Sequence, residues 1–215
     1  IGQNRRAQVR PQEIETRSME IIEEELGERA AAWPPEELLV VKRCIHTSAD
    51  FDYGENLVFS PGAVEIALEA LRNGVTIVTD TSMAAAGINK RSAAALGVEV
   101  RCFIADPDVA AEAKGRGITR SAVCMERAAA LGRPVIAAVG NAPTALMRIK
   151  ELADEGRFRP ELVIGVPVGF VNVVEAKEMI LGTDIPHIVA RGRKGGSNIA
   201  AAIVNALLYQ VRREE

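Results

Sequence analysis

Two histidines are the side chains of this sequence best suited to acid–base chemistry. His46 stands at the expected end of a helix, just before the polar stretch Thr47 to Asp50. A helix C-terminus favours the imidazolium form, which can donate a proton near neutral pH. A capping histidine without chemistry is the alternative, and this feature alone favours it. His187 follows Ile185 and Pro186 at the start of an apolar strand, so we expect it to be structural.

Arg43 lies three residues before His46, on the same face of the expected helix. It can hold a substrate carboxylate beside His46 or be a surface charge, and both readings stay open. Cys44 points about 200° away from His46 around the helix, so a Cys–His pair is not expected. Two distant histidines argue against a zinc site. The Gly-x-Ser-x-Gly motif of many hydrolases does not occur.

Polar or glycine-rich loops follow the expected strands. They are residues 80–83, 140–144, 167–170 and 191–197. Glycine lets a backbone approach a ligand, and the free N–H groups at a helix start attract anions. One such loop is most often an ordinary turn, but several on one edge of a sheet favour a binding site. The last loop adds Arg191, Arg193 and Lys194.

The expected anion is a carboxylate on a large ligand. The phosphate-loop pattern is missing from residues 192–197, and no Gly-x-Gly-x-x-Gly follows a strand. Arginine suits carboxylates, because its planar fork can bind both oxygens.

The elements that must position these residues alternate along the chain. Apolar runs at 75–79, 98–104, 134–139, 162–166 and 187–190 are separated or followed by helical stretches near 107–115, 119–131, 143–155, 172–181 and 197–211. This alternation predicts an α/β fold, a three-layer, flavodoxin-like doubly wound parallel sheet of about five strands. Ligands of such sheets bind at the carboxyl ends of the strands.

An α-helical addition precedes the sheet. Helices are expected from Ile14 to about Gly27, from Glu36 to about His46 and over 61–73, with Ser60 and Pro61 as N-cap and first-turn pair. Residues 47–59 are expected to form a loop. We therefore predict a single domain, 1–215, with a helical part over 1–74 and a parallel α/β core over 75–215.

Composition fits a soluble globular domain, with 48% apolar and 26% charged residues. The net charge of −3 argues against a nucleic-acid partner. No signal peptide is recognised, and the apolar runs are too short to cross a membrane. The three cysteines show no disulfide or metal spacing, so we expect a cytoplasmic protein.

Seven segments, in this order and spacing, resemble the precorrin-8X methylmutase family, including its cobalt-precorrin-8 counterpart. Each is weak alone, but together they are specific and extend from about Ile14 to Leu208. The segments are Arg17-Ser18, Arg43-Cys44-Ile45-His46, Phe59-Ser60-Pro61, Thr119-Arg120-Ser121, Gly140 to Leu146, Val166 to Val171 and Arg191 to Ser197.

The resemblance implies an isomerase of cobalamin biosynthesis. A methyl group would move from C-11 to C-12 of a corrinoid tetrapyrrole, formally a 1,5-sigmatropic shift. His46 would protonate, or donate a hydrogen bond to, a ring nitrogen next to the migration site. No cofactor or protein-bound metal is implied, and a homodimer with sites near the subunit interface is. The expected substrate-binding residues, from the resemblance and the loops, are Ser18, Arg43, Thr47, Ser82, Met83, Arg120, Asn141, Thr144, Gly169 and Arg193.

Two other functions compete with this one. A non-catalytic corrinoid-binding or carrier protein on the same fold would keep the loop arginines but would not need His46. A flavodoxin-like nucleotide or flavin binder is disfavoured, because its phosphate motif is missing. Absorbance separates them, since a copurified corrinoid and a bound flavin differ in colour.

Overall fold

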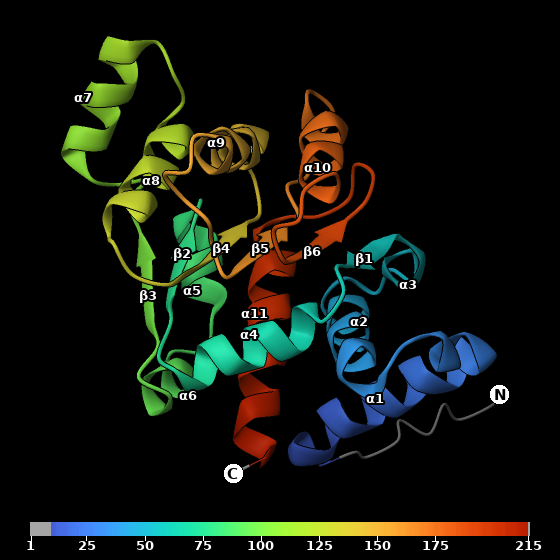
Figure 1. Ribbon diagram of the computed structural model, residues 1–215. Helices are drawn as coiled ribbons and strands as arrows, with labels where there is room; N and C mark the ends of the chain where they lie inside the picture. Colours follow the sequence, from blue (N-terminus) through green and yellow to red (C-terminus); the bar gives the residue numbers. More distant parts are fainter. Residues whose placement is uncertain (1–9, 215) are drawn as a thin grey trace, which may run out of the picture.

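Six strands form one sheet in the order β1-β6-β5-β4-β2-β3 in the computed structural model, which describes residues 10–214 (Figure 1). The five strands from β2 to β6 are parallel to their neighbours. Their order, β3-β2-β4-β5-β6, is the flavodoxin-like one, so the predicted fold class is confirmed. The strands are β1 (Leu57–Phe59), β2 (Thr76–Thr79), β3 (Glu99–Cys102), β4 (Val135–Val139), β5 (Leu162–Gly165) and β6 (His187–Ala190).

The sixth strand, β1, was not predicted. It lies inside the segment 47–59, expected to be a loop, and pairs antiparallel with β6, with Leu57 opposite Ala190. Three residues are too few to show a period of two, so β1 could not be recognised from the sequence. The short helix α3 (Tyr53–Asn56) precedes β1, and together they bring the chain after His46 to the β6 edge.

The predicted long helices are present within about two residues at most ends. Four short helices, over residues 27–32, 53–56, 82–87 and 90–95, were missed, because six residues or fewer cannot display a helical period. The helices are α1 (Pro11–Leu26), η1 (Gly27–Ala32, a 3-10 helix), α2 (Pro35–Ser48), α4 (Ala63–Arg72), α5 (Ser82–Gly87), α6 (Lys90–Ala95), α7 (Pro107–Arg116), α8 (Arg120–Ala130), α9 (Pro143–Asp154), α10 (Val173–Leu181) and α11 (Ser197–Glu214). Within residues 10–214, no helix combines the length and apolar character needed to span a bilayer.

Helices cover both faces of the sheet, and each face has its own hydrophobic core (Figure 1). Val163 and Val189 belong to the core shared with α7, α8, α9 and α10. Ile164 and Ile188, the next residues along the same strands, belong to the core shared with α2, α4 and α11. Successive strand residues point to opposite faces, so strands buried on both sides must be apolar throughout.

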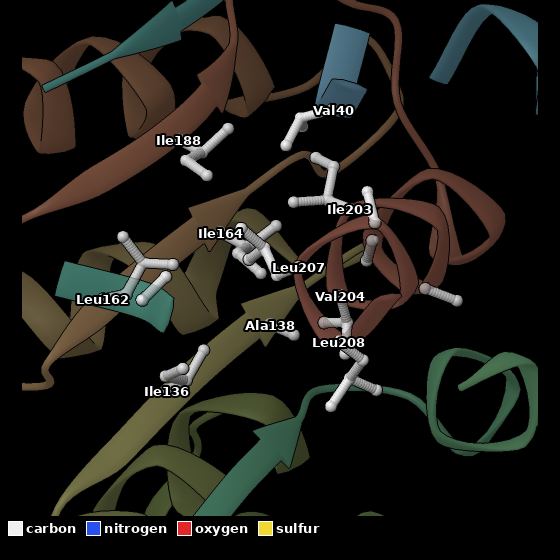
Figure 2. Close-up of a cluster of buried hydrophobic side chains, with 14 of the residues drawn as sticks. Val40, Ile136, Ala138, Leu162, Ile164, Ile188, Ile203, Val204, Leu207 and Leu208 are labelled. Atoms are coloured by element: carbon white, nitrogen blue, oxygen red, sulfur yellow. The ribbon is translucent and has the colours of Figure 1, made fainter. Parts of the chain in front are cut away.

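The C-terminal helix α11 packs on the second face of the sheet and positions α2. In Figure 2, Ile203 and Leu207 of α11 lie close to Ile164 of β5, and Val40 of α2 lies near Ile203. Gln210 Nε2, near the end of α11, donates to the carbonyl of Glu36, near the start of α2, at 3.1 Å. The two helices therefore run antiparallel, and the end of α2 that carries His46 lies towards the start of α11.

The predicted helix start at Ser60 and Pro61 is wrong. Helix α4 begins at Ala63, after Gly62 in the left-handed conformation. The Ser60 hydroxyl instead accepts the backbone N–H of His187 at 2.8 Å, so it ties the end of β1 to β6. The buried imidazole of His187 donates through Nδ1 to the Ile185 carbonyl at 2.7 Å, which agrees with the structural role expected for it.

Candidate active site

The carboxyl edge of the sheet, hereafter the rim, consists of the loops after β2, β4, β5 and β6. Its centre is Asp80, which is fully buried directly after β2. The Asp80 carboxylate accepts backbone N–H groups from Gly140 at 2.9 Å, Asn141 at 3.1 Å and Ala142 at 2.7 Å. Burial raises the pKa of Asp80, and the three N–H donors oppose that rise.

The expectation that these N–H groups bind a ligand anion is therefore corrected. The loop before α9 does offer an anion site, but Asp80 occupies it. The sequence held one clue, since Asp80 and Gly140 each follow a strand and β2 and β4 prove to be neighbours. Without the strand order, that clue could not be used.

A second contact closes the rim between β2 and α11. The hydroxyl groups of Thr81 and Ser197 lie 2.7 Å apart, and Thr81 also accepts the Ala84 N–H at 3.0 Å to cap α5. Gly140 makes this approach possible, because a Cβ there would lie 2.7 Å from the Ser197 Cα. The loops after β2, β4 and β6 are thus in direct contact.

The loop after β6, residues 191–196, is held through its backbone carbonyls. The Lys177 ammonium, buried on α10, donates to the carbonyls of Gly192 and Lys194, each at 2.8 Å. The carbonyl between them, that of Arg193, accepts the Gly169 N–H at 3.1 Å. Sequence reasoning missed Lys177. The signal was present, because Lys177 shares the apolar stripe of Val173, Ala176 and Ile180.

The charged side chains of this loop differ in their partners. Arg191 Nε lies 2.8 Å from Glu178, and Lys194 Nζ lies 2.6 Å from Asp50 and 2.5 Å from Asp52. The hydrogen bond from Lys194 lowers the pKa of Asp50. The Arg193 guanidinium lies 5.3 Å from the Phe170 ring centroid, and in residues 10–214 no carboxylate pairs with it. Arg193 is therefore the loop cation best placed to accept a ligand carboxylate.

His46 lies in the last turn of α2, four residues before Asp50. Both His46 and Thr47 are exposed. The bonds from Lys194 to Asp50 and Asp52 tie the segment directly after His46 to the rim. Within the described part of the chain, the His46 imidazole makes no hydrogen bond or ion pair, so its two nitrogens are available to a ligand.

The other two helical residues expected in the site are differently engaged. The Ser18 hydroxyl donates to the Ile14 carbonyl of its own helix at 2.8 Å. Arg43 Nη2 lies 2.8 Å from Glu15, and its guanidinium lies 5.2 Å from the Tyr209 ring centroid. A hollow of about 390 Å³ between α1, α2 and α11 contains Arg43 and Glu15. For residues 10–214, no hydrogen bond or ion pair joins Ser18 or Arg43 to the rim loops.

The remaining expected residues lie on or beside the rim. Ser82 and Met83 open α5, and the Met83 side chain is 77% exposed. Asn141 is exposed between β4 and α9. Arg120 is the exposed first residue of α8, whose cap Thr119 lies 2.7 Å from Thr144 between hydroxyl oxygens. The structure therefore gathers Ser82, Met83, Asn141, Thr144, Gly169 and Arg193 at one edge of the sheet.

A larger hollow, of about 630 Å³, lies at the opposite edge of the sheet. Its arginines are already paired, Arg133 with Glu99 and Arg159 with Asp184. Ligands of doubly wound sheets bind at the carboxyl edge, so we place the site at the rim. In residues 10–214, no group of three or more His, Cys, Asp or Glu side chains could hold a metal ion.

Comparison with known proteins gives a consistent result. The family model described as CbiC, precorrin-8X methylmutase, matches residues 13–210. The chain is 46% identical over 206 residues to the cobalt-precorrin-8 methylmutase of Salmonella typhimurium, covering 94% of this chain and 96% of the relative. It is 44% identical over 203 residues to that of Methanothermobacter thermautotrophicus, covering 94% and 95%.

A solved structure agrees in both fold and sequence. The crystal structure of precorrin-8X methyl mutase from Thermus thermophilus matches with a TM-score of 0.86 and 39% identity, over 94% of this chain and 98% of that one. The family match over most of the chain, the close relatives and this likeness confirm the resemblance read from the seven sequence segments: the chain belongs to the precorrin-8X methylmutase family.

Proposed function

We propose that this chain moves a methyl group from C-11 to C-12 of precorrin-8X or cobalt-precorrin-8, with His46 as proton donor and acceptor. Family membership supports the isomerase activity and its place in cobalamin biosynthesis. One structural observation supports the role of His46. An exposed imidazole, engaged by no other group in residues 10–214, lies at the end of α2, and the next segment is bound to the rim through Lys194.

The reaction requires the protein to bind the substrate and to supply one proton. The substrate carries several acetate and propionate groups, which suit the Arg193 guanidinium at the rim and that of Arg43 on α2. His46 would donate its proton, or a hydrogen bond, to the ring nitrogen beside the migrating methyl group. It would recover the proton when the methyl group reaches C-12, so the enzyme returns to its starting state.

The carrier alternative is not favoured. A non-catalytic corrinoid binder would not need the free imidazole at the end of α2, and the relatives are named as methylmutases. The names include both cobalt-precorrin-8 and precorrin-8X methylmutases, so both substrates belong in the test.

The decisive experiment replaces His46 by Ala and by Asn, and assays each variant with the metal-free and the cobalt-containing substrate. We expect kcat to fall by about 10²- to 10⁴-fold, the usual contribution of a general acid. The Kd for substrate should change little, because the rim and Arg43 would still bind the carboxylates. Added imidazole should restore part of the His46→Ala activity. Turnover at the wild-type rate in both variants would overturn the role of His46.

We also propose a homodimer in the cytoplasm. The exposed apolar residues Val168, Phe170 and Val171 on the rim, 47%, 81% and 76% exposed, support a partner surface near the site. Light scattering at micromolar concentration tests the dimer.

The three cysteines are free, which supports a reducing compartment. The core cluster that joins Val40 of α2 to Ile164 of β5 supports a single domain.

A further inference from the structure

We propose that Lys177 is a positioning residue, which holds the loop after β6 so that Arg193 faces the substrate. The proposal rests on the proposed function, because it assigns Arg193 a carboxylate of the corrinoid. It adds a residue that does not touch the substrate and that lies on α10, outside every rim loop.

The geometry around Lys177 supports this role. Its ammonium donates to the carbonyls of Gly192 and Lys194 at 2.8 Å each, and these two residues flank Arg193. The Arg193 carbonyl accepts the Gly169 N–H at 3.1 Å. Three consecutive carbonyls are therefore bound, which fixes the backbone from which the Arg193 side chain projects.

Arg193 depends on this backbone more than its neighbours do. Arg191 is also held by Glu178, and Lys194 by Asp50 and Asp52. Among the described residues, the Arg193 guanidinium forms no ion pair and lies over the ring of Phe170, a residue that is itself 81% exposed. Because no carboxylate partner holds the Arg193 guanidinium, its position depends on the backbone that carries it.

A lysine in this position needs a reason, because burying an ammonium is unfavourable. The Lys177 side chain is 0% exposed, and no carboxylate in residues 10–214 forms an ion pair with it. Burial alone lowers the pKa of Lys177 to about 8. A neutral amine still carries two N–H donors for the two carbonyls, so the two hydrogen bonds to the loop do not require the charge.

The test begins with Lys177→Met, which keeps the length of the side chain and removes its donors. Lys150→Met is the matched control, because Lys150 is on α9 and pairs only with Asp154. We expect the KM for the corrinoid substrate to rise about 10-fold or more in Lys177→Met, the loss of about one charge-assisted contact, with kcat changed less than about 3-fold. A purely structural role would lower the active fraction, and hence kcat, and leave KM unchanged.

The double variant Lys177→Met/Arg193→Gln separates the possible outcomes. If Lys177 acts through Arg193, the double variant has the same KM as Arg193→Gln alone. A normal KM in Arg193→Gln would overturn the carboxylate contact proposed for the rim. A raised KM in Arg193→Gln together with a normal KM in Lys177→Met would overturn only the positioning role.

Amide hydrogen exchange gives a readout that needs no turnover. The Gly169 N–H, which donates to Arg193, should exchange at least about 10-fold faster in Lys177→Met, while the Val163 N–H at the sheet should not change. If Lys177→Met does not fold, Lys177→Leu, which also lacks donors, is measured in the same way. An unchanged Gly169 exchange rate in the folded variant contradicts the proposal.

Discussion

The rim of the sheet and the end of α2 use their polar groups in opposite ways. Buried side chains bind backbone groups of the rim loops: Asp80 holds the loop before α9, and Lys177, on α10, holds the loop after β6. At the end of α2, His46 is exposed and unengaged within residues 10–214. This difference suggests that the rim provides a fixed shape and α2 provides the chemistry. Substitution of Asp80 should therefore lower stability, that of Lys177 substrate affinity, and that of His46 turnover.

The largest effect on this comparison is expected from Asp80→Ala. The substitution leaves three backbone N–H groups of Gly140, Asn141 and Ala142 without their acceptor. Unpaired buried donors are costly, so the free energy of unfolding should fall by about 3–5 kcal/mol. Urea denaturation measures it. Asp106→Ala is the control, because Asp106 precedes α7 without a side-chain cap bond. A loss below about 1 kcal/mol in Asp80→Ala would mean that the rim is not held by this carboxylate.

The next effect is a pH dependence of stability that comes from Lys177. Its pKa is lowered from 10.5 to about 8 in the folded chain. Between these values the unfolded chain binds a proton that the folded chain lacks, so the free energy of unfolding rises with pH. Across the window the rise amounts to about 3 kcal/mol. Denaturation of wild type and Lys177→Met at pH 8 and pH 10.5 isolates this contribution. Parallel pH profiles for the two proteins would mean that folding does not lower the pKa of Lys177.

The sequence was sufficient for the fold because the parallel strands are buried on both faces. Runs such as 162–166 are continuously apolar, and the helices between them are long enough to show their period. The elements missed, β1, η1, α3, α5 and α6, are too short to show any period. The extra strand matters to the site, since β1 and α3 bring the segment after His46 to the β6 edge.

The candidate site was predicted less completely, for a different physical reason. His46 stood out because a histidine at a helix end has a recognisable chemistry. The sequence could not reveal which polar groups were already engaged. Asp80 binds N–H groups about sixty residues later, and Arg43 pairs with Glu15 on another helix. Such partners are set by strand order and helix packing, which spacing along the chain does not report.

A smaller effect, on the helical side of the comparison, is expected from Arg43→Ala. If Arg43 binds a substrate carboxylate, the variant should bind substrate more weakly by about 1.5–3 kcal/mol, the value of a hydrogen bond to a charged group. Titration calorimetry with the substrate measures the Kd. Arg29→Ala is the control, because Arg29 is an exposed helical arginine paired with Glu55. An unchanged Kd in Arg43→Ala would return Arg43 to a structural contact with Glu15 and Tyr209.

The smallest effect tests whether Glu15 competes with the substrate for Arg43. The two side chains lie 2.8 Å apart, and Glu15 is 59% exposed, so solvent limits their attraction to about 0.5–1 kcal/mol. A substrate carboxylate that binds Arg43 must displace Glu15, so Glu15→Gln should lower the Kd for substrate by about 2- to 5-fold. Glu20→Gln controls for the loss of one negative charge on α1, since Glu20 pairs with Arg17 instead. The gain should vanish in the Arg43→Ala background. Weaker binding in Glu15→Gln alone would mean that the ion pair persists in the complex and that Arg43 acts by holding α1 against α2.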